Sequence, residues 1–340
     1  MPLRRNFLAG GLATLTAFPP LAARAAGGEP EVKELRYQGM ASAVGYPELA
    51  ENLGYLAPLR LRWVGNTISG PQDIQATVTG DTDFGQAFHS AILKLIGVGA
   101  PLVAVIGNTG TDAKSWSGLY TLEDSPVQGP RDLVGRKVGV NTYGAHNEFV
   151  LQEYLRRAGL APAEIAQVTL VVLPPSNAEQ ALRLRQIDAV FLSPIFREKA
   201  ASRGGIRLLQ SDFELFGEFT TGSYVLTRRF IARNPNAARV FVSGTARAIE
   251  WAHTREPAEV VARLAEIIHR RNRGGEDDSA VRYWKSIALG AKGGVLADRN
   301  FTLFLDWFRA NGNAAVARLK PAEVYTNAFN PYAEGTDRQG

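Results

Sequence analysis

The amino-acid sequence predicts an α/β protein of two domains, in which parallel-rich sheets are flanked by helices. Short apolar runs alternate with helical patterns from Val32 onward, and this alternation is typical of strand–helix–strand units with mostly parallel strands. The length of 340 residues corresponds to about two domains of ordinary size, each large enough to bury its own core. With 45% apolar and 21% charged residues, the composition is that of a globular protein and excludes a chain that is disordered throughout.

The first block of the chain predicts strands that alternate with helices. In order, they are a strand at 34–38, a helix at 46–55, a strand at 59–64, a helix at 72–79, a strand opened by Asp83, a helix at 91–96 and a strand at 102–106. Pro71 suits the first turn of the second helix, where the N–H that proline lacks would have no partner in any case. Gly80 is placed to end the same helix.

The second block repeats this plan. It predicts a strand at 136–140, a helix after Gly144 with an apolar face, a strand at 168–173, a helix opened by a capping box of Ser176 and Glu179, and a strand at 187–191. Asp83 in the first block and Asp188 in the second both lie just past a helix end and just before a strand. This echo indicates two similar lobes.

After Gly222 the predicted pattern becomes helical. Pro235 and Pro257 are each placed to begin a helix. Another helix is predicted between Asp298 and Gly312, because large apolar residues recur there at helical spacing, and we expect these residues to pack in a core. They are Phe301, Phe304, Leu305 and Phe308. The Gly- and Arg-rich stretch 270–275 is predicted to be a solvated turn.

The N-terminus has the features of an export signal. Arg4 and Arg5 precede a modestly apolar run at 7–21, and small residues at 23–25 would permit cleavage. The run is shorter than the roughly 20 residues that cross a bilayer, and the arginine pair is typical of a twin-arginine signal. We therefore expect a signal peptide at 1–25, cleaved near Ala25, and a periplasmic mature protein. A buried N-terminal helix is the alternative.

The net charge does not indicate a nucleic-acid partner. The formal charge is +5, but removal of Arg4, Arg5 and Arg24 with the signal would leave the mature chain at +2. No stretch alternates basic and aromatic residues as a nucleic-acid platform does. No later apolar run approaches the length of a membrane span, so we expect a soluble mature protein, with no nucleic acid among its partners.

Motifs that carry catalysis or hold cofactors are absent from the sequence. The chain contains no cysteine, which excludes disulfides, thiolate metal sites and a lipid anchor on cysteine. No glycine-rich dinucleotide or phosphate loop, no nucleophile elbow and no H-E-x-x-H pair occurs. The four histidines have no metal-ligand spacing. The sequence therefore favours binding over catalysis, with no metal and no cofactor.

Polar, small and aromatic residues follow the predicted strands, at the edge where ligands bind in open parallel sheets. The candidate ligand-binding residues are Ser42, Tyr46, Ser69, Gly70, Gln72, Gln86, Phe88, His89, Asn108, Trp116, Thr142, Tyr143, Gly144, Ala145, His146 and Ser193. Loops that precede a helix would direct backbone N–H groups and the positive end of the helix dipole at this edge, which suits a compact anion such as a sulfonate. The aromatic members could enclose the organic part of such a ligand.

Several of these residues also have a structural alternative. Ser69 and Thr142 are placed to cap helices. For Phe88, Trp116, Tyr143 and His89 the alternative is an interior side chain. Asp83 and Asp188 are expected to hold turn amides rather than ligand.

Short motifs recur in an order and spacing that is more specific than any one of them. They are Gly45-Tyr46-Pro47, Ser69-Gly70-Pro71, Gly-Asp-Thr-Asp-Phe-Gly at 80–85, Asp-Leu-Val-Gly-Arg-Lys-Val-Gly-Val at 132–140, Tyr143-Gly144-Ala145-His146 and Asp188-Ala189. Together they resemble the nitrate/sulfonate/taurine-type substrate-binding proteins of ABC importers, over roughly residues 30 to 255. The chain departs from that pattern at Arg185, where the family often has Gly, and at 193–194, where it has Ser-Pro instead of Glu-Pro. The loss of an acid there fits an anionic ligand.

The resemblance implies a two-lobed periplasmic binding protein fold of type II, with a ligand cleft between hinged lobes. We expect one lobe of 30–120 plus 225–335 and a second lobe of 121–224. Ligand contacts are implied on the loops at 42–46, 69–72, 85–89 and 143–146 and at Ser193. The implied partners of this monomer are an ABC permease and ATPase at the inner membrane.

The alternative is an enzyme on the same fold, of the menaquinone- or pyrimidine-pathway type. The pyrimidine enzymes carry a Cys-rich motif that this chain lacks.

Overall fold

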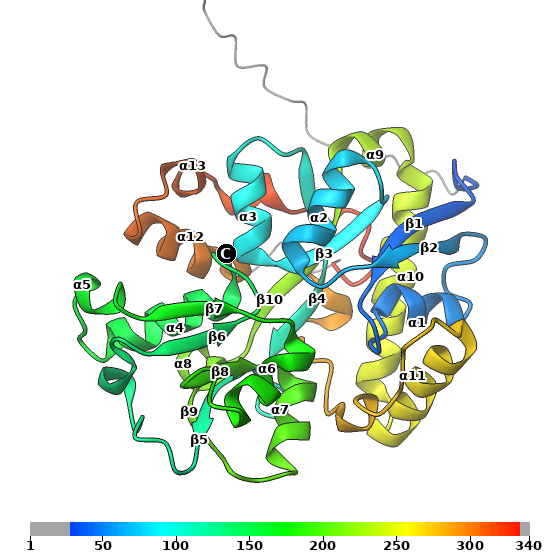
Figure 1. Ribbon diagram of the computed structural model, residues 1–340. Helices are drawn as coiled ribbons and strands as arrows, with labels where there is room; N and C mark the ends of the chain where they lie inside the picture. Colours follow the sequence, from blue (N-terminus) through cyan, green and yellow to red (C-terminus); the bar gives the residue numbers. More distant parts are fainter. Residues whose placement is uncertain (1–27, 334–340) are drawn as a thin grey trace, which may run out of the picture.

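The computed structural model describes residues 28–333, and the elements below belong to that part of the chain (Figure 1). The predicted signal peptide at 1–25 lies outside the described residues. Within them, no helix combines the length and the apolar character that a membrane crossing requires.

The described strands form three sheets. The strands are β1 (Glu34–Gly39), β2 (Arg60–Asn66), β3 (Phe84–Phe88), β4 (Leu102–Thr111), β5 (Gly118–Leu122), β6 (Lys137–Val140), β7 (Thr169–Val172), β8 (Ala189–Leu192), β9 (Ile206–Ser211) and β10 (Phe219–Thr227). Their order is β1-β2 in a two-stranded sheet, β3-β10-β4 in a three-stranded sheet and β7-β6-β8-β5-β9 in a five-stranded sheet. The predicted α/β class is confirmed.

Helices alternate with many of the strands and dominate the C-terminal third of the chain. They are α1 (Tyr46–Asn52), α2 (Gly70–Thr79), α3 (His89–Gly97), α4 (His146–Arg157), α5 (Pro162–Ile165), α6 (Pro175–Arg183), α7 (Pro194–Ala201), α8 (Asp212–Phe216), α9 (Arg228–Arg233), α10 (Pro235–Thr254), α11 (Pro257–Arg271), α12 (Arg299–Ala310), α13 (Ala314–Ala317) and α14 (Pro321–Val324). Short 3-10 turns lie at Pro130–Leu133, Val281–Tyr283 and Lys292–Gly294. The helix starts predicted at Pro235 and Pro257 are confirmed.

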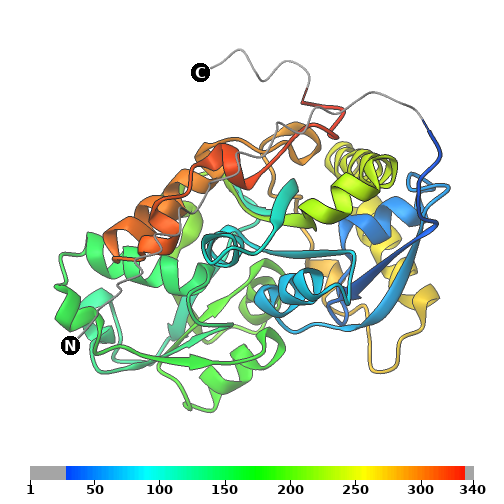
Figure 2. The ribbon, with the colours of Figure 1, turned by 90° about the horizontal axis from the view of Figure 1, so that it is seen from above.

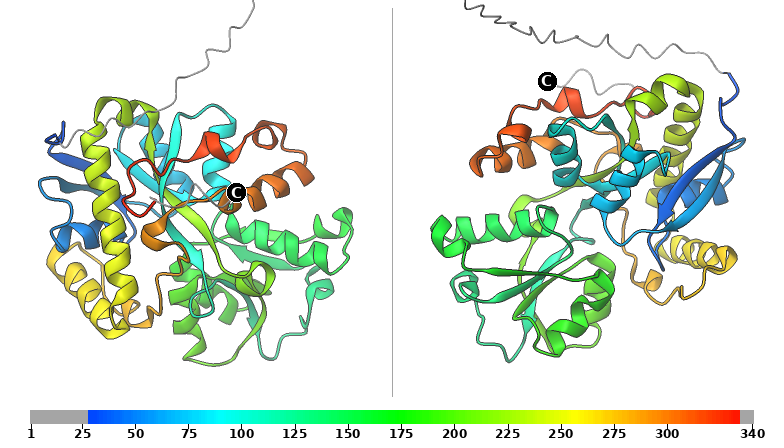
Figure 3. Two further views of the ribbon diagram at one scale, coloured as in Figure 1. Left: turned by 180° about the vertical axis from the view of Figure 1, so that it is seen from behind. Right: turned by 45° about the horizontal axis from the view of Figure 1, so that its top comes forward.

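The chain passes between the five-stranded sheet and the other strands twice. It leaves β4 at Thr111 and enters β5 at Gly118, and it returns from α8 at Phe216 to β10 at Phe219. β10 then pairs antiparallel with both β3 and β4, so the three-stranded sheet is completed only after the five-stranded one. Figure 3 shows the two groups of strands from two further sides.

The echo in the sequence corresponds to one repeated interaction between neighbouring strands. Asp83, directly before β3, accepts the backbone N–H of Arg36 in β1 at 2.7 Å and pairs with the Arg36 guanidinium. Asp188, directly before β8, accepts the backbone N–H of Lys137 in β6 at 2.9 Å and lies 3.5 Å from Arg136. In both places the backbone N–H of the aspartate donates to the carbonyl of the same partner residue. Both aspartates therefore have the expected structural role, although they hold strand amides rather than turn amides.

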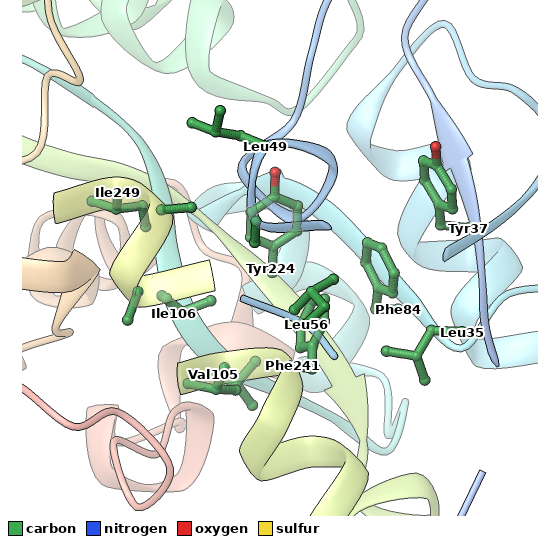
Figure 4. Close-up of a cluster of buried hydrophobic side chains, with 14 of the residues drawn as sticks. Leu35, Tyr37, Leu49, Leu56, Phe84, Val105, Ile106, Tyr224, Phe241 and Ile249 are labelled. Carbon is green, nitrogen blue, oxygen red and sulfur yellow. The ribbon is translucent and has the colours of Figure 1, made fainter. Parts of the chain in front are cut away.

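A buried cluster packs α1 and α10 against β1, β3, β4 and β10 (Figure 4). At its centre the ring of Phe84 stacks on Tyr37, with ring centroids 5.6 Å apart, and lies 4.6 Å from Phe241 of α10. Gly244 allows α10 to pack closely against the backbone at Tyr55, because a Cβ at position 244 would lie 2.5 Å from the carbonyl oxygen of Tyr55. This contact fixes the long helix against the strands.

A second cluster joins α12 to both groups of strands. The ring of Phe304 lies 4.8 Å from that of Phe149 in α4, and Phe301 lies 4.3 Å from the ring of His89 in α3. Trp307 also donates to Gln152 of α4 at 3.0 Å. Figure 2 shows α12, in orange, beside the green α4. The residues predicted to form a core here are all buried: Phe301, Phe304, Leu305 and Phe308.

Three strands, β5, β9 and β10, are missing from the sequence-based prediction. For β10 the prediction is wrong outright, because a helical pattern was expected after Gly222 and the strand continues to Thr227. Every residue of β10 before Thr227 is buried. A strand that is buried on both faces lacks the alternation of apolar and polar residues by which a strand is usually recognised.

The capping box predicted from Ser176 and Glu179 is also wrong. α6 begins at Pro175, so Ser176 lies inside the first turn and hydrogen-bonds to Asn177. Proline is favoured at the first helical position, which fixes the N-cap of this helix at Pro174, two residues before Ser176. At the other end, Arg185 has a φ of 55°, in the left-handed region that favours glycine, and this explains why a glycine suits that position.

The stretch 270–275 is only in part the solvated turn that the sequence predicts. Gly274 and Gly275 form an exposed turn, whereas two of the arginines are not solvated. Arg271 and Arg273 are buried, with side chains 9% and 7% exposed. Both donate to Glu48 of α1, at 3.0 and 3.2 Å, and Arg271 also pairs with Glu276 at 2.6 Å. Two buried cations are tolerated because two buried carboxylates face them. The ion pairs with Glu48 hold the segment that follows α11 against α1.

We expect Phe304→Ala to lower the free energy of unfolding by about 3 to 5 kcal/mol, because it leaves a cavity where α12 meets α4. Chemical denaturation followed by circular dichroism measures this change. Leu184→Ala, at a side chain that is 60% exposed, is the control and should change stability by less than about 0.5 kcal/mol. Equal stability of the two variants would show that α12 adds nothing to the core.

Candidate ligand-binding site

Three strands of the five-stranded sheet end at one edge, and a helix begins after each of them there. β6 pairs in parallel with both β7 and β8, so the carboxyl ends of the three strands coincide. They lead to α4, α6 and α7 respectively. At this edge lies a cavity of about 40 Å³. It is lined by Phe88, Ser117, Val140, Asn141, Asn147, Leu173, Pro175, Ala178, Val190, Phe191 and Ser193.

The cavity presents neutral polar groups and the beginnings of three helices. Asn147 lies in the first turn of α4, Pro175 begins α6, and Ser193 is the N-cap residue of α7. Free N–H groups and the helix dipole give such ends a partial positive charge. None of the lining residues, all within the described chain, has an ionisable side chain. The Oδ1 atom of Asn141 is buried without a hydrogen-bond partner. The arrangement suits a compact, negatively charged group on a ligand that also offers a hydrogen-bond donor.

Phe88 closes the cavity from the opposite group of strands. It is the last residue of β3, and its ring stacks on His146, the first residue of α4, with centroids 4.7 Å apart and planes 12° from parallel. His146 is buried, and its Nε2 donates to Oδ2 of Asp212 at 2.9 Å. One wall of the cavity is thus held by a buried imidazole–carboxylate pair.

Asp212 also contacts the two crossings, which are the segments where the chain passes between the five-stranded sheet and the other strands. It begins α8, close to the second crossing, and its Oδ1 accepts the hydroxyl of Thr111 at 3.2 Å and the backbone N–H of Ser117 at 3.0 Å, on either side of the first crossing. Its side chain is 2% exposed, so these donors replace water around the carboxylate. Phe88, His146 and both crossings therefore share one network.

His89 is an interior side chain. Its Nδ1 donates to the carbonyl of Asn300 at 3.0 Å, which leaves Nε2 to accept the hydroxyl of Ser223 at 2.7 Å. Burial lowers the pKa of His89 to about 3, so the ring is neutral. Both nitrogens are already used, which fits the interior alternative for this residue.

Gln86 and Asn108 form a side-chain pair between β3 and β4. Asn108 donates to Oε1 of Gln86, while Oδ1 of Asn108 is buried without a partner. The backbone N–H of Gln86 donates to Asp73 of α2 at 2.8 Å. Asp73 is 1% exposed, and its burial raises the pKa of the carboxyl to about 7. This pair lies at the sheet rather than in the lining of the cavity.

The candidates after β1 contact the C-terminal part of the chain. Ser42 accepts the backbone N–H of Asp277 at 3.1 Å. The hydroxyl of Tyr46 points at the carbonyl of Ile287, 3.5 Å away, and burial raises its pKa. These side chains hold the loop between β1 and α1 in place.

The candidates after β2 organise the entry to α2. Gln72 accepts the backbone N–H of Ile68 at 3.3 Å. Ser69 is the N-cap residue by position but makes no side-chain capping bond. Gly70 permits close packing, because a Cβ there would lie 2.8 Å from Ala87 of β3.

The segment between β6 and α4 contains four candidates with different surroundings. Tyr143 is 60% exposed, and its hydroxyl donates to the carbonyl of Leu170 in β7 at 3.3 Å. Gly144 has a φ of 64°. Ala145, not Thr142, is the N-cap residue of α4, so the capping alternative for Thr142 is wrong.

The candidate Trp116 lies in a separate groove, against the guanidinium of Arg197.

Of the sequence candidates, the cavity therefore brings together Phe88 and Ser193, with His146 behind Phe88. The candidate set left out Asn141 and Ser117, which also line it. Asn141 directly follows a predicted strand, so the strand-end rule could have selected it. Ser117 precedes β5, which the sequence did not predict, and no signal marks it. Within residues 28–333, no group of three or more His, Asp or Glu side chains is placed to hold a metal ion.

A family model described as NMT1/THI5 like matches residues 64–259, more than half of the chain. The matched range contains β3, β4, β10 and the whole five-stranded sheet. A comparison with curated proteins found no match.

Solved structures of similar fold include binding proteins and an enzyme. The periplasmic aliphatic sulphonate binding protein SsuA from Escherichia coli is 21% identical, with a TM-score of 0.63 over 83% of this chain and 89% of that chain. The periplasmic nitrate-binding protein NrtA from Synechocystis PCC 6803 is 12% identical, with a TM-score of 0.65 over 89% and 88%. The desulfurization enzyme DSZB is 14% identical, with a TM-score of 0.57 over 88% and 96%. The likeness confirms the predicted periplasmic binding protein fold.

We expect Asp73→Asn to stabilise the protein at alkaline pH. The carboxyl ionises at about 7 in the folded state and at about 3.9 in the unfolded chain. Between these values the folded state holds the extra proton, so the stability of the wild type falls as pH rises. Asparagine keeps an acceptor for Gln86 and does not ionise.

The free energy of unfolding of this variant should exceed that of the wild type by a margin that grows from about pH 4 and reaches about 1 to 4 kcal/mol above about pH 7. Denaturant titrations at several pH values measure it. Asp306→Asn, at a carboxylate that is 62% exposed, is the control and should give no such trend. A margin that stays constant with pH would contradict the burial of an ionisable Asp73.

Proposed function

The chain belongs to the NMT1/THI5-like family, and we propose that it is the extracytoplasmic solute-binding component of an ABC importer. In this role it captures a small organic anion of the sulfonate, taurine or nitrate type and delivers it to a membrane permease coupled to an ATPase. The names of two proteins of the same fold support this role, since SsuA is a sulphonate binding protein and NrtA a nitrate-binding protein.

The observation that carries the proposal is the cavity where three helix beginnings and Phe88 meet. A binding protein needs groups that recognise a ligand without reacting with it. Amide, hydroxyl and backbone N–H groups do so, and the lining of this cavity offers only such groups beside apolar side chains. Its volume of about 40 Å³ admits a compact head group, so the rest of a larger ligand would extend out of it.

The ligand class follows from the polarity of the cavity. Partial positive charge at three helix starts attracts anionic oxygens. Asn141 offers a buried acceptor, Oδ1, which calls for an N–H or O–H donor on the ligand. A sulfonate that also carries an amino group, as taurine does, satisfies both requirements.

We propose lobes of 30–120 plus 225–335 and of 121–224, which close on the ligand by a hinge motion. In the present arrangement Phe88 of the first lobe already lies against the cavity of the second, so opening of the lobes would withdraw it. The contact between Phe304 and Phe149 joins the same two lobes in the present arrangement. A contact that persists during closure lies near the hinge axis, and the crossings held by Asp212 provide that axis.

We propose export to the periplasm, with a signal peptide at 1–25, and action as a monomer that meets the permease in its closed form. Of these features, the proposed location is supported by the names of SsuA and NrtA, which call those proteins periplasmic.

The competing function is an enzyme on the same fold, because DSZB is named a desulfurization enzyme. The pair of His146 and Asp212, 2.9 Å apart, is the observation that would favour it. Phe88 stacks on that imidazole, and the ring is 1% exposed. Both facts favour a positioning role for the pair over proton transfer to a ligand.

Isothermal titration calorimetry with taurine, an alkanesulfonate, nitrate and an aromatic carboxylate tests the proposal. We expect one of them to bind with a dissociation constant on the order of micromolar. Asn141→Leu and Phe88→Ala should each weaken that binding by about tenfold or more, because they remove an acceptor and a wall of the cavity. Asn311→Leu, at an exposed asparagine, is the matched control and should leave affinity unchanged.

Mass spectrometry of the same mixtures after prolonged incubation separates the two functions. A binding protein returns its ligand intact, whereas consumption of the ligand would establish the enzyme instead. Equal affinity in the wild type and Asn141→Leu would show that the ligand lies outside this cavity.

A further inference from the structure

The segment 277–286, which follows α11, reaches from one proposed lobe to the surface of the other. We call this segment the strap, and it contains the 3-10 turn Val281–Tyr283. It belongs to the lobe of 30–120 plus 225–335, and it lies beside α7 of the lobe 121–224. Figure 1 shows the strap, in orange, between α11 and α7. It therefore connects two parts of the chain that a hinge motion would separate.

The strap is anchored in its own lobe at both ends and in the middle. The backbone N–H of Asp277 donates to Oγ of Ser42 at 3.1 Å, and the hydroxyl of Ser286 donates to Oδ2 of Asp112 at 2.7 Å. Between these ends Val281 is 3% exposed and packs in the buried cluster that includes α1 and α10. These contacts hold the strap to the first lobe, so it would move with that lobe.

Two polar contacts join the strap to α7 and to the residue that directly follows α7. The hydroxyl groups of Tyr283 and Ser202 are 3.3 Å apart. The ammonium of Lys285 lies 3.7 Å from Oε2 of Glu198. Both contacts cross from the first proposed lobe to the second.

The other end of the strap carries the opposite charge. Its residue there is Asp277, whose pKa is lowered by a hydrogen bond from Ser279 and by the positive charge of Lys199 in α7. A basic residue of the strap thus faces an acidic residue of α7, and an acidic residue of the strap lies near a basic one. This reversed order of charges favours one register of the strap on α7.

These polar contacts differ from the apolar contact that also joins the two lobes. Phe304 and Phe149 are fully buried, so their separation would expose apolar surface to water. Lys285 is 52% exposed and Glu198 is 26% exposed, so water can replace their contact at little cost. An exposed contact of this kind changes the ratio of two arrangements by up to about fivefold. The strap is therefore the part of the interface between the lobes that can release.

We propose that the strap holds the two lobes together before any ligand is bound, and that its release sets the fraction of molecules able to admit a ligand. When the strap leaves α7, the lobes open and Phe88 is withdrawn from the cavity. When the strap returns, Phe88 covers the cavity again. The inference rests on the lobes and the hinge of the proposed function, but not on the identity of the ligand.

Distance measurements by double electron–electron resonance on the ligand-free chain test the strap. The sequence contains no cysteine, so Val98→Cys and Leu184→Cys provide the attachment points for two spin labels. These positions are 73% and 60% exposed and lie in different lobes. The labelled chain should show mainly the distance that corresponds to the arrangement described here. In this background Tyr283→Phe/Lys285→Gln removes a hydroxyl and a charge from the strap and keeps the aromatic ring.

We expect the strap variant to raise the ratio of open to closed molecules by about threefold or more, because it removes both contacts with α7 that have a measured distance. Tyr332→Phe/Lys320→Gln makes the same two changes elsewhere in the first lobe. It is the matched control and should leave the distance distribution unchanged.

The proposal is overturned if the strap variant and the control have the same distance distribution, or if the native strap already leaves the ligand-free chain mainly open. Neither result affects the proposed function, which calorimetry and mass spectrometry test through the ligand. Conversely, consumption of a ligand would overturn the proposed function, while the labelled, ligand-free chain would still report whether the strap holds the lobes together.

Discussion

A carboxylate that is shielded from water has to be surrounded by hydrogen-bond donors, and at Asp212 this requirement ties together distant parts of the chain. Its donors come from Thr111, Ser117 and His146, which lie on both sides of one crossing and at the start of α4. Removal of any one donor would leave a buried charge incompletely solvated. The network therefore fixes the start of α4 relative to the two crossings. Because Phe88 stacks on His146, the same network places a ring from β3 over the end of the five-stranded sheet. The position of the cavity follows from this one buried group.

The parts of the fold that the sequence predicted correctly are those fixed by local chemistry. Prolines mark the starts of α10 and α11, and the apolar spacing of α12 identifies side chains that prove to be buried. The echo between Asp83 and Asp188 was visible because each aspartate performs the same task, which is to hold the backbone of a nearby strand. Elements whose surroundings come from remote segments were missed or misjudged. β10 is buried on both faces by chain that precedes and follows it, and Arg271 and Arg273 are buried because Glu48 and Glu276 receive them. No local sequence pattern predicts the burial of β10 or the burial of these arginines.

The same division applies to the candidate site. Residues after a strand can be selected from sequence, and Phe88, Ser193 and the overlooked Asn141 all fall under that rule. The rule cannot say which of them face the same space. Ser42, Tyr46 and Gln72 also follow strands, yet their polar atoms serve the loops that contain them. His89 differs from His146 in the same way, because two neighbours use both of its nitrogens and burial keeps it neutral. Which strand-end residues remain available for a ligand depends on tertiary partners that only the folded chain reveals.

The lining of the cavity has an electrostatic explanation. An ionic side chain in a small enclosed cavity would lose most of its hydration, at a cost that a single ligand contact rarely offsets. Backbone N–H groups at helix starts provide positive potential without that cost, because they are dipoles already fixed by the fold. Arg197 is buried under different conditions, because its guanidinium is stacked on Trp116 and hydrogen-bonded to Glu198. Enclosure thus selects dipoles where a charge has no partner, and it allows a full charge only where a ring and a carboxylate receive that charge.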